Sequence, residues 1–486
     1  MHILITGADR PLGKLAAGRF SASHSLRLTG QAASLDGPTH SEYVQADLRN
    51  PEQAKPLVAG IDAILHLDPY DPAPVSGPTA EQERLDIAGR GTYVLFLEGR
   101  EAGVSRFVIA GTLAAFEGYD KRYVIDEQFQ PQPAADAESL APMLAELTAR
   151  EFAREGGVRC ACLRFGVLGD SGTNTDDALE AIEEALAREF EARDRSWDLK
   201  HVTSGQHIAR GTDDVAVAGG DSGRLEKGKL CIFGAGGPVG TSATRALQDD
   251  YTLRLTDLRA VEEIEEQSPY APKPEPPEPP HEWRQVDITN YDQVLAAAQG
   301  MDSLINCSVL RHDLVPAFRV NLLGAYNVMK AAVECGIRRV IHTGPRHIGL
   351  NHDADYYFDF DIPDEAPLHP GTDLYAISKY LGGQVVRVFA EQHNLEVITF
   401  LYCNFRISYA GDNEDGSGVT CFATSWEDTG TAFPCALRAP APPNPYEVFD
   451  IVASLPHGKF SNAKAKRLLG WTPKHNFERL YTRPNK

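Results

Sequence analysis

The sequence lacks any uninterrupted run of about 18 apolar residues, the length that an α-helix needs to cross a bilayer. Its eight cysteines include no Cys-x-x-Cys pair, and no histidine and carboxylate cluster has a recognisable metal-ligand spacing. We therefore expect no membrane partner, no metal site and no disulfide framework. The first expected strand begins directly after Met1, which leaves no room for a targeting leader and predicts a cytoplasmic protein.

Basic residues are also scarce, because 47 Lys and Arg stand against 68 Asp and Glu, for a net charge of -21. Nucleic acid backbones require basic patches, so a nucleic-acid partner is not expected. An acidic stretch at 176–186 spaces Leu179, Ile182 and Leu186 three and four residues apart, which predicts an amphipathic helix. A chain of 486 residues is too long for one hydrophobic core and fits two domains.

A short apolar run at 229–233 leads into a turn that has glycine at its first, fourth and seventh places. This pattern predicts a strand, a tight turn and a helix start, whose unpaired amides attract a diphosphate. The candidate cofactor contacts in the turn are Gly234, Gly236, Gly237, Pro238, Val239 and Gly240. Asp257 ends the next expected strand about twenty residues on, where a carboxylate can bind the ribose of NAD. That carboxylate disfavours NADP, although the nearby Arg259 can soften the preference.

Tyr375 and Lys379 are four residues apart in an expected helix, so their side chains lie on one face. A free phenol has a pKa near 10, and a neighbouring ammonium stabilises the phenolate. The pair is therefore a candidate for proton transfer at neutral pH.

Residues 229–486 resemble an extended short-chain dehydrogenase/reductase of the NAD-dependent epimerase/dehydratase type. Tyr375 and Lys379 match the catalytic pair of that family, and Asn321 matches the asparagine of its Asn-x-x-Gly segment. Asp287, followed by Ile288, matches the aspartate that lies near the adenine. The resemblance implies that Tyr375 transfers a proton, that Lys379 lowers its pKa and holds the nicotinamide ribose, and that Asn321 orders the site.

The first half repeats the pattern, since residues 3–13 are again a strand and a glycine turn, with Arg10 at the place of the middle glycine. Gly30 stands where Asp257 stands, Ala88 stands where Asn321 stands, and the segment 139–144 offers neither the tyrosine nor the lysine. We therefore predict an internal duplication with a degenerate first copy, which does no redox chemistry and binds a dinucleotide weakly or not at all.

The expected fold is two tandem Rossmann-like α/β domains, 1–225 and 229–486, joined through the glycine-rich run 219–228. Each is a doubly wound parallel sheet with a small C-terminal substrate lobe. Related enzymes form dimers through helices, and the fused first copy could take the place of a partner, so a homodimer is left open.

A Ser or Thr just past the fifth strand completes the catalytic set of the family. Aligning the two halves puts Thr112 at this position in the first half and Pro345, which has no donor, in the second. Thr343 or His347 could substitute for the missing hydroxyl.

The resemblance implies hydride transfer at a carbinol carbon of a sugar or nucleotide sugar, without deciding between epimerase and dehydrogenase. The run Arg346-His347-Ile348-Gly349 resembles a segment of uronate dehydrogenases, and Arg346 could pair with a carboxylate or phosphate of the substrate. An enzyme of the uronate or aldose dehydrogenase kind is therefore an alternative. A second alternative is a non-catalytic protein that senses NAD or serves as a scaffold.

Overall fold

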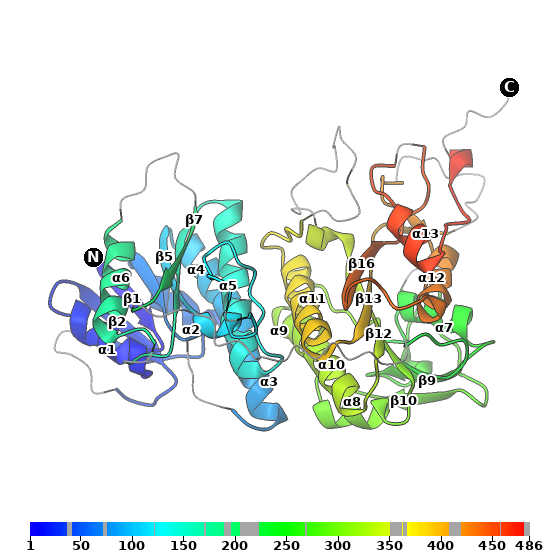
Figure 1. The fold of residues 1–486 in the computed structure, drawn as a ribbon, viewed down its shortest axis with the longest axis horizontal. Coiled ribbons are helices and arrows are strands. Elements are labelled where there is room, and N and C mark those ends of the chain that lie inside the picture. The colour runs from blue at the N-terminus through cyan, green and yellow to red at the C-terminus, as the bar shows by residue number, and fades with distance from the viewer. Residues whose placement is uncertain are drawn as a thin grey trace. The chain divides into compact units, whose positions relative to one another are not determined.

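The computed structural model describes residues 1–35, 41–70, 75–120, 122–169, 172–188, 196–204, 223–267, 270–349, 362, 367–407, 419–456 and 458–480. The chain divides into two compact units, Met1–Val217 and Ala218–Lys486, each of which is described by itself (Figure 1). Residues 219–222 of the expected connecting run lie outside the described residues.

The first unit is a parallel sheet of seven strands in the order β3-β2-β1-β4-β5-β6-β7. Its strands are β1 (His2–Thr6), β2 (Ser25–Gly30), β3 (Ser41–Gln45), β4 (Ala63–His66), β5 (Arg106–Thr112), β6 (Arg159–Phe165) and β7 (Trp197–Val202). Its α-helices are α1 (Pro11–Phe20), α2 (Pro51–Val58), α3 (Pro78–Asp86), α4 (Thr92–Glu101), α5 (Ala137–Glu155) and α6 (Thr175–Ala187). A π-helical segment, η1 (Ile87–Gly91), and a 3-10 helix, η2 (Leu113–Phe116), complete it.

The second unit has a parallel sheet of the same kind, in the order β10-β9-β8-β11-β12-β13-β16. Its strands are β8 (Lys229–Phe233), β9 (Thr252–Asp257), β10 (Glu282–Gln285), β11 (Ser303–Asn306), β12 (Arg339–Pro345), β13 (Glu396–Tyr402) and β16 (Tyr446–Asp450). A separate two-stranded sheet pairs β14 (Phe405–Arg406) with β15 (Thr424–Ser425).

The helices of the second unit lie on both faces of its large sheet. They are α7 (Pro238–Leu247), α8 (Tyr291–Ala298), α9 (Leu314–Phe318), α10 (Gly324–Glu334), α11 (Leu374–His393), α12 (Trp426–Arg438) and α13 (Ala463–Leu469). A π-helical segment η4 (Arg319–Leu323) and the 3-10 helices η3 (Val261–Glu263), η5 (Arg346–Gly349) and η7 (Glu478–Leu480) complete the unit.

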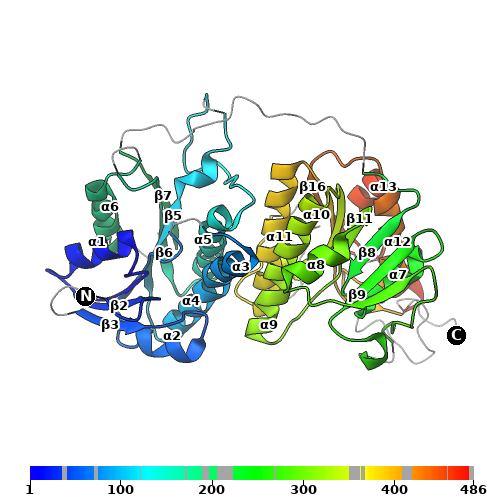
Figure 2. The same cartoon turned by 90° about the horizontal axis from the view of Figure 1, so that it is seen from below.

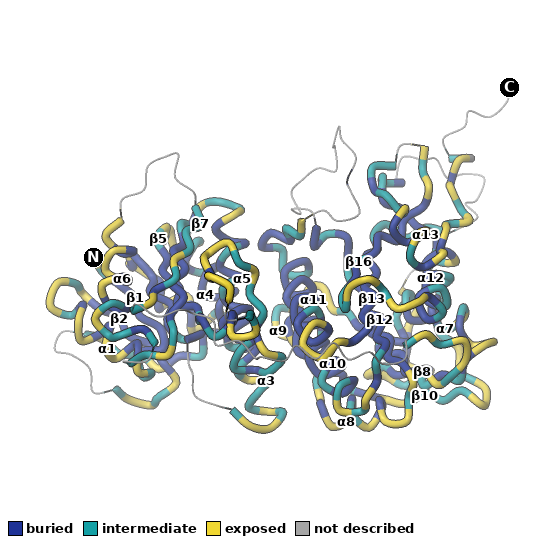
Figure 3. The backbone as a smooth tube through the Cα atoms, in the orientation of Figure 1, coloured by how far each residue is buried: buried dark blue, intermediate teal, exposed yellow. Residues whose placement is uncertain are grey.

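Each sheet is the buried middle layer of its unit (Figure 3). In the first unit α1 and α6 cover one face and α2, α4 and α5 cover the other (Figure 2). In the second unit α7 and α12 cover one face and α8, α10 and α11 cover the other (Figure 2). The amphipathic helix expected at 176–186 is confirmed, because α6 buries Leu179, Ile182 and Leu186. The expected doubly wound α/β architecture is confirmed in both units.

The strand registers show which residues of the two units correspond. Arg27 pairs with Glu42 in the sheet of the first unit, and Arg254 pairs with Glu282 at the same place in the second. Counting along β2 and β9 from these arginines brings Gly30 and Asp257 to the same position. The registers therefore agree with the expected alignment of the two halves.

Candidate functional site

The glycine turn after β8 leaves the first turn of α7 open to an anion. Gly234 has a φ of +74°, and a Cβ there would lie 2.7 Å from the backbone nitrogen of Ser308. Gly237 caps α7 without a side-chain hydrogen bond, and the first turn of the helix carries no acidic residue. The nearest atom to a Cβ on Gly237 would be 3.5 Å away. Backbone amides at a helix N-terminus with open space above them fit a diphosphate.

Asp257 ends β9 beside this turn. Its Oδ2 accepts a hydrogen bond of 3.2 Å from the backbone N–H of Gly236, and its Oδ1 lies 3.5 Å from Nε of Arg259. A Cβ on Gly236 would lie only 2.6 Å from the Asp257 carboxylate, so this approach requires glycine. The carboxylate and the uncapped helix end together fit the ribose and diphosphate of NAD. Arg259, about half exposed, partly balances the charge of Asp257.

Asp287 and Ile288 lie at the next strand end. Oδ1 of Asp287 accepts hydrogen bonds from the backbone N–H and the hydroxyl of Thr289, at 2.9 Å and 2.8 Å. Ile288 is buried, and a Cβ on Gly324 would lie 3.0 Å from its side chain. The short apolar contact explains why the family segment that begins at Asn321 carries a glycine at its fourth position.

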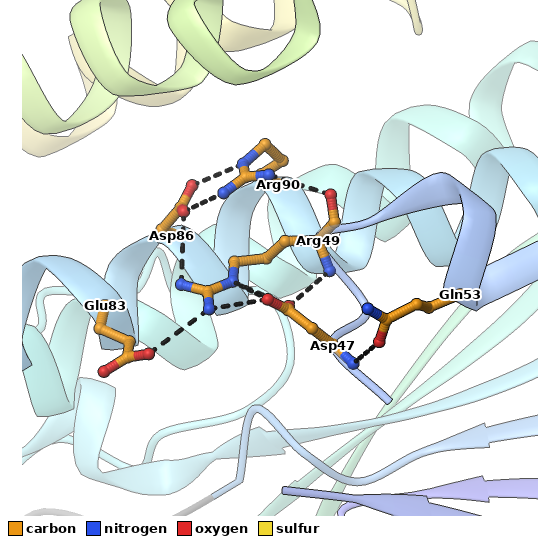
Figure 4. A network of polar contacts seen from close by, with 6 residues as sticks. All are labelled: Asp47, Arg49, Gln53, Glu83, Asp86 and Arg90. Atoms are coloured by element: carbon orange, nitrogen blue, oxygen red, sulfur yellow. Dashed lines mark hydrogen bonds and ion pairs between the residues drawn. The ribbon is translucent and has the colours of Figure 1, made fainter. Parts of the chain in front are cut away.

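The corresponding aspartate of the first unit, Asp47, is held in an ion-pair network (Figure 4). Nε of Arg49 lies 2.8 Å from Oδ1 of Asp47, and a terminal nitrogen of Arg49 lies 2.8 Å from Oδ2. The same guanidinium contacts Glu83 at 3.4 Å and Asp86 at 3.6 Å. Arg90 in turn pairs with Asp86. Asp47 is therefore neutralised within the protein, whereas Asp287 is not paired with an arginine in the described residues.

In the first unit the acid and the glycine have changed places relative to Gly236 and Asp257 of the second unit. Asp9 stands in the turn where Gly236 stands, and Gly30 ends β2 where Asp257 ends β9. The Asp9 carboxylate accepts hydrogen bonds of 2.9 Å from the backbone N–H groups of Gln31 and Ala32. A Cβ on Gly30 would lie 2.2 Å from this carboxylate. The acid of the first unit thus extends from the glycine turn to the end of β2, whereas Asp257 extends from the strand end to the turn. Its carboxylate is engaged by backbone N–H groups and is not free to bind a ribose.

Lys379 reaches the edge of the sheet from α11. Its ammonium donates hydrogen bonds to the backbone oxygens of Ser308, at 2.7 Å, and Thr343, at 3.1 Å. Burial lowers the pKa of Lys379 to about 8, which the charge of Arg311 reinforces and the Cys307 thiol opposes. The ammonium is thus fixed between the ends of β11 and β12.

Tyr375 lies one helical turn before Lys379, near the start of α11, where Asp373 caps the helix by accepting from the N–H of Ala376. The guanidinium carbon of Arg311 lies 5.3 Å from the centre of the Tyr375 ring. Burial raises the pKa of Tyr375, whereas the charge and hydrogen bond of Arg311 lower it. The cation that acts on the phenol in this structure is therefore Arg311, which motif reading did not identify.

Asn321 joins the elements of the site. It lies in the π-helical segment η4, and its amide donates to the backbone oxygen of Leu310 at 2.7 Å and to the hydroxyl of Ser378 at 3.0 Å. Its own oxygen accepts from the backbone N–H of Leu310 at 3.2 Å. π-Helical turns often occur at functional sites because they redirect side chains. Asn321 thereby fixes the loop that carries Arg311 to the helix that carries Tyr375.

The structure distinguishes between the two residues expected to replace the missing hydroxyl. The hydroxyl of Thr343 is buried and donates to the backbone oxygen of Asn306 at 2.9 Å, inside the sheet. Pro345 ends β12 and is buried. The ring of His347 lies 6.4 Å from that of Tyr375, and its Nε2 lies 3.7 Å from the sulfur of Cys403. The His347 ring therefore lies beside that of Tyr375, whereas the Thr343 hydroxyl is bonded to the neighbouring strand β11.

Arg346, the other expected substrate contact, is buried. Its Nε lies 3.0 Å from Oδ1 of Asp450, and its guanidinium carbon lies 4.7 Å from the centre of the Phe460 ring. The charge of Arg346 is therefore balanced by Asp450 within the protein. The two residues are far apart in the sequence, so no local motif could have indicated this pairing.

Arg311 and Cys403 were missed because they belong to no motif. Each follows the carboxyl end of a parallel strand, β11 or β13, and ligands bind at this edge of doubly wound sheets. That topological position was the available signal. Within the described parts of the chain, no group of three or more histidines, cysteines and acidic residues could hold a metal ion. A helix long and apolar enough to span a membrane is also absent there.

Comparison with known proteins adds the following matches. A family model described as the NAD dependent epimerase/dehydratase family matches residues 3–206 and 230–429. An L-arabinose 1-dehydrogenase (NAD(P)(+)) of Haloferax volcanii is 22% identical over 270 residues, which cover 51% of this chain and 97% of that protein. The crystal structure of uronate dehydrogenase from Agrobacterium tumefaciens is 21% identical, with 54% of this chain and 92% of that chain covered and a TM-score of 0.41. A UDP-N-acetylglucosamine 4-epimerase structure from Bacillus cereus is 17% identical, with 42% and 79% covered and a TM-score of 0.33.

Proposed function

Because the chain belongs to the NAD dependent epimerase/dehydratase family, we propose that its second unit oxidises a carbinol carbon of a sugar with NAD. The observation that carries this proposal is the position of Ser308. Its backbone nitrogen closely approaches Gly234 of the glycine turn, and its oxygen accepts from the Lys379 ammonium at 2.7 Å. One residue thus connects the candidate diphosphate turn with the candidate catalytic pair.

The side chains would divide the reaction as follows. When bound, NAD⁺ accepts the hydride from the carbinol carbon. Tyr375 takes the proton of the sugar hydroxyl as the carbon becomes a carbonyl. Lys379 would hold the nicotinamide ribose and supply positive charge there. Asn321 keeps the Leu310 loop and α11 in place. The cofactor would be held by the glycine turn, Pro238, Val239, Asp257, Asp287 and Ile288.

We assign to His347 the role of the missing hydroxyl at Pro345. Its ring faces Tyr375, and either ring nitrogen can donate or accept a hydrogen bond. The hydroxyl of Thr343 would first have to leave the Asn306 oxygen, which it contacts at 2.9 Å. An imidazole at this place can hold the substrate oxygen while the proton moves to Tyr375.

The match to the L-arabinose dehydrogenase, of which 97% is covered, favours dehydrogenation over epimerisation. An epimerase returns the hydride to the sugar and accumulates no reduced cofactor, whereas a dehydrogenase releases it as NADH. This difference separates the two reactions in one measurement. The first unit, with Asp9, Gly30 and Arg10 at its turn, would contribute no redox chemistry.

The test is a sugar panel with purified full-length protein and NAD⁺, read at the absorbance band of reduced nicotinamide. Neutral aldoses, uronates and nucleotide sugars form its three arms, and separation of the products reveals any epimer. NADH formed with a free sugar supports the proposal. An epimer without net NADH would replace dehydrogenation by epimerisation. If NAD binds but no product forms in any arm, the proposed oxidoreductase activity is contradicted.

A non-catalytic protein that senses NAD is the second candidate, and Pro345 is the observation that favours it. Proline has no donor, so the second unit has lost one member of the usual catalytic set. A sensor would keep NAD affinity in the absence of turnover. The same panel tests this point, because NAD binding without product in any arm favours the sensor and product in any arm excludes it.

A further inference from the structure

Arg311 is an exposed cation placed against the candidate catalytic tyrosine. It lies in the loop after β11, and its guanidinium carbon is 5.3 Å from the centre of the Tyr375 ring. Among the described residues no carboxylate lies within ion-pair distance of Arg311.

The other cations of the site are already committed. The Lys379 ammonium is buried and donates to two backbone oxygens, and Arg346 is buried against Asp450. Neither can meet a charged substrate without giving up these contacts. Arg311 keeps most of its donors, because a guanidinium has more N–H groups than one tyrosine can accept.

The site itself determines where Arg311 lies. Leu310, its neighbour in sequence, is held at both its N–H and its oxygen by the side chain of Asn321. The same asparagine contacts Ser378 on α11, three residues after Tyr375. The side chain of Asn321 therefore anchors the loop that carries Arg311 to α11.

The charge of Arg311 also acts on several groups of the site. It lowers the pKa of Tyr375 and of Cys403, against the effect of burial, and that of Lys379 together with burial. All three side chains are therefore close enough to respond to it. A ligand group that binds Arg311 would lie next to the reacting atoms.

We propose that Arg311 binds the carboxylate of a sugar acid and makes uronates the preferred substrate class of this site. Guanidinium groups bind carboxylates through paired N–H donors, which gives orientation as well as attraction. A neutral sugar would leave this cation facing water and gain little from it. The inference rests on the proposed sugar oxidation and adds to it the residue that selects the substrate.

The experiment compares Arg311→Gln and Arg311→Lys with the control Arg319→Gln, which removes an exposed arginine from η4. D-galacturonate and D-galactose are the probes, because they differ only at C6, which is a carboxylate in the first and a hydroxymethyl group in the second. Wild-type protein is expected to prefer the uronate by about tenfold or more in kcat/KM, as for a hydrogen bond to a charged group. Arg311→Gln should remove this preference through the KM of the uronate, Arg311→Lys should retain part of it, and Arg319→Gln should leave it intact.

Calorimetric titration of each sugar onto the protein saturated with NADH measures recognition without turnover. Tighter binding of the uronate that depends on Arg311 supports the inference even when no oxidation occurs, in which case only the proposed function fails. Equal binding of the two sugars by wild-type protein overturns the inference. So does an equal loss for both sugars in Arg311→Gln, which would mark a structural role. Preference for galactose 6-phosphate over galacturonate would overturn it in favour of a phosphate ligand.

Discussion

Arg339 and Glu396 form an ion pair at the first residues of β12 and β13, and the Arg339 side chain is fully buried. Nε of Arg339 lies 3.0 Å from Oε2 of Glu396. Its guanidinium also donates to the backbone oxygens of Ala436, Leu437 and Ala439, at 2.9, 3.0 and 2.7 Å. This one side chain fastens the end of α12 to the sheet of the second unit.

Replacing Arg339 by methionine is expected to lower the free energy of unfolding of the second unit by about 3–5 kcal/mol, because Oε2 of the buried Glu396 and three backbone oxygens lose their donor. Arg338 still lies 3.3 Å from Oε1 of Glu396, so the carboxylate keeps one ion pair. Arg106, which begins β5 at the corresponding place, provides the matched control. It is only partly buried and donates to the backbone oxygens of Leu186 and Arg188. Arg106→Met should therefore cost less, about 1 kcal/mol. Urea unfolding compares the two, and equal losses would contradict the special role of Arg339.

The two ribose-position acids predict which unit binds the cofactor. Asp257→Asn should weaken NAD binding about tenfold by removing a charged hydrogen-bond acceptor, and should improve NADP relative to NAD. The matched variant Asp9→Asn should leave NAD affinity unchanged, since the Asp9 carboxylate already accepts hydrogen bonds from the N–H groups of Gln31 and Ala32. Calorimetric titration should give one NAD per chain. Two bound NAD per chain, or a loss in Asp9→Asn, would show that the first unit binds the dinucleotide.

Tyr375→Phe is expected to abolish turnover while leaving NAD affinity nearly intact, because only the proton-transferring hydroxyl is removed. Tyr402→Phe is the control. The Tyr402 hydroxyl is buried and has no hydrogen-bond partner in the described residues, so its removal should leave activity unchanged. Initial rates and NAD titration separate the two effects. Turnover that persists in Tyr375→Phe would exclude this residue as the proton acceptor.

Stability of the first unit should fall in acid because of His66. This histidine is buried between the hydroxyls of Thr6, at 2.7 Å, and Thr92, at 2.9 Å. Burial lowers its pKa to about 3, against the ordinary value of 6.5. Between these values the unfolded chain binds a proton that the folded chain does not, so stability decreases as pH falls from about 6.5 towards 3.

The slope from one such group reaches about 1.4 kcal/mol per pH unit. Urea unfolding at a series of pH values should show a smaller slope for His66→Gln than for the wild type. Burial also lowers the pKa of His342 in the second unit, so that unit should weaken in the same direction. Identical slopes for the wild type and His66→Gln would contradict the assignment to His66.

The architecture was predictable because its signals are local and repeated. The glycine turn at Gly234, the acid at Asp257 and the recurring strand patterns predict a doubly wound sheet. The spacing of Leu179, Ile182 and Leu186 predicts α6, and the helix is present. These features depend on residues near one another in the sequence, so a single sequence is sufficient to recognise them.

The arrangement of the site was predictable only in part. Lys379 lies in the expected helix, but its ammonium donates to the backbone oxygens of Ser308 and Thr343. These partners are distant in the sequence, so the helix pattern could not predict them. Arg311 and Tyr375 are more than sixty residues apart in the sequence, yet their side chains are in contact. No sequence spacing predicts such a pair. A substrate role for Arg346 was plausible from the sequence, but Asp450 at the end of β16 balances its charge within the protein.

The exchange of Asp9 and Gly30 limits how an acid can be introduced at the strand end of the first unit. An acid at position 30 would place its Cβ 2.2 Å from an oxygen of Asp9, so that substitution is blocked while Asp9 remains. Removal of Asp9 first would take away the acceptor for the N–H groups of Gln31 and Ala32. The two positions are therefore coupled, and conversion of the first unit to a turn of the NAD-binding kind requires a double substitution.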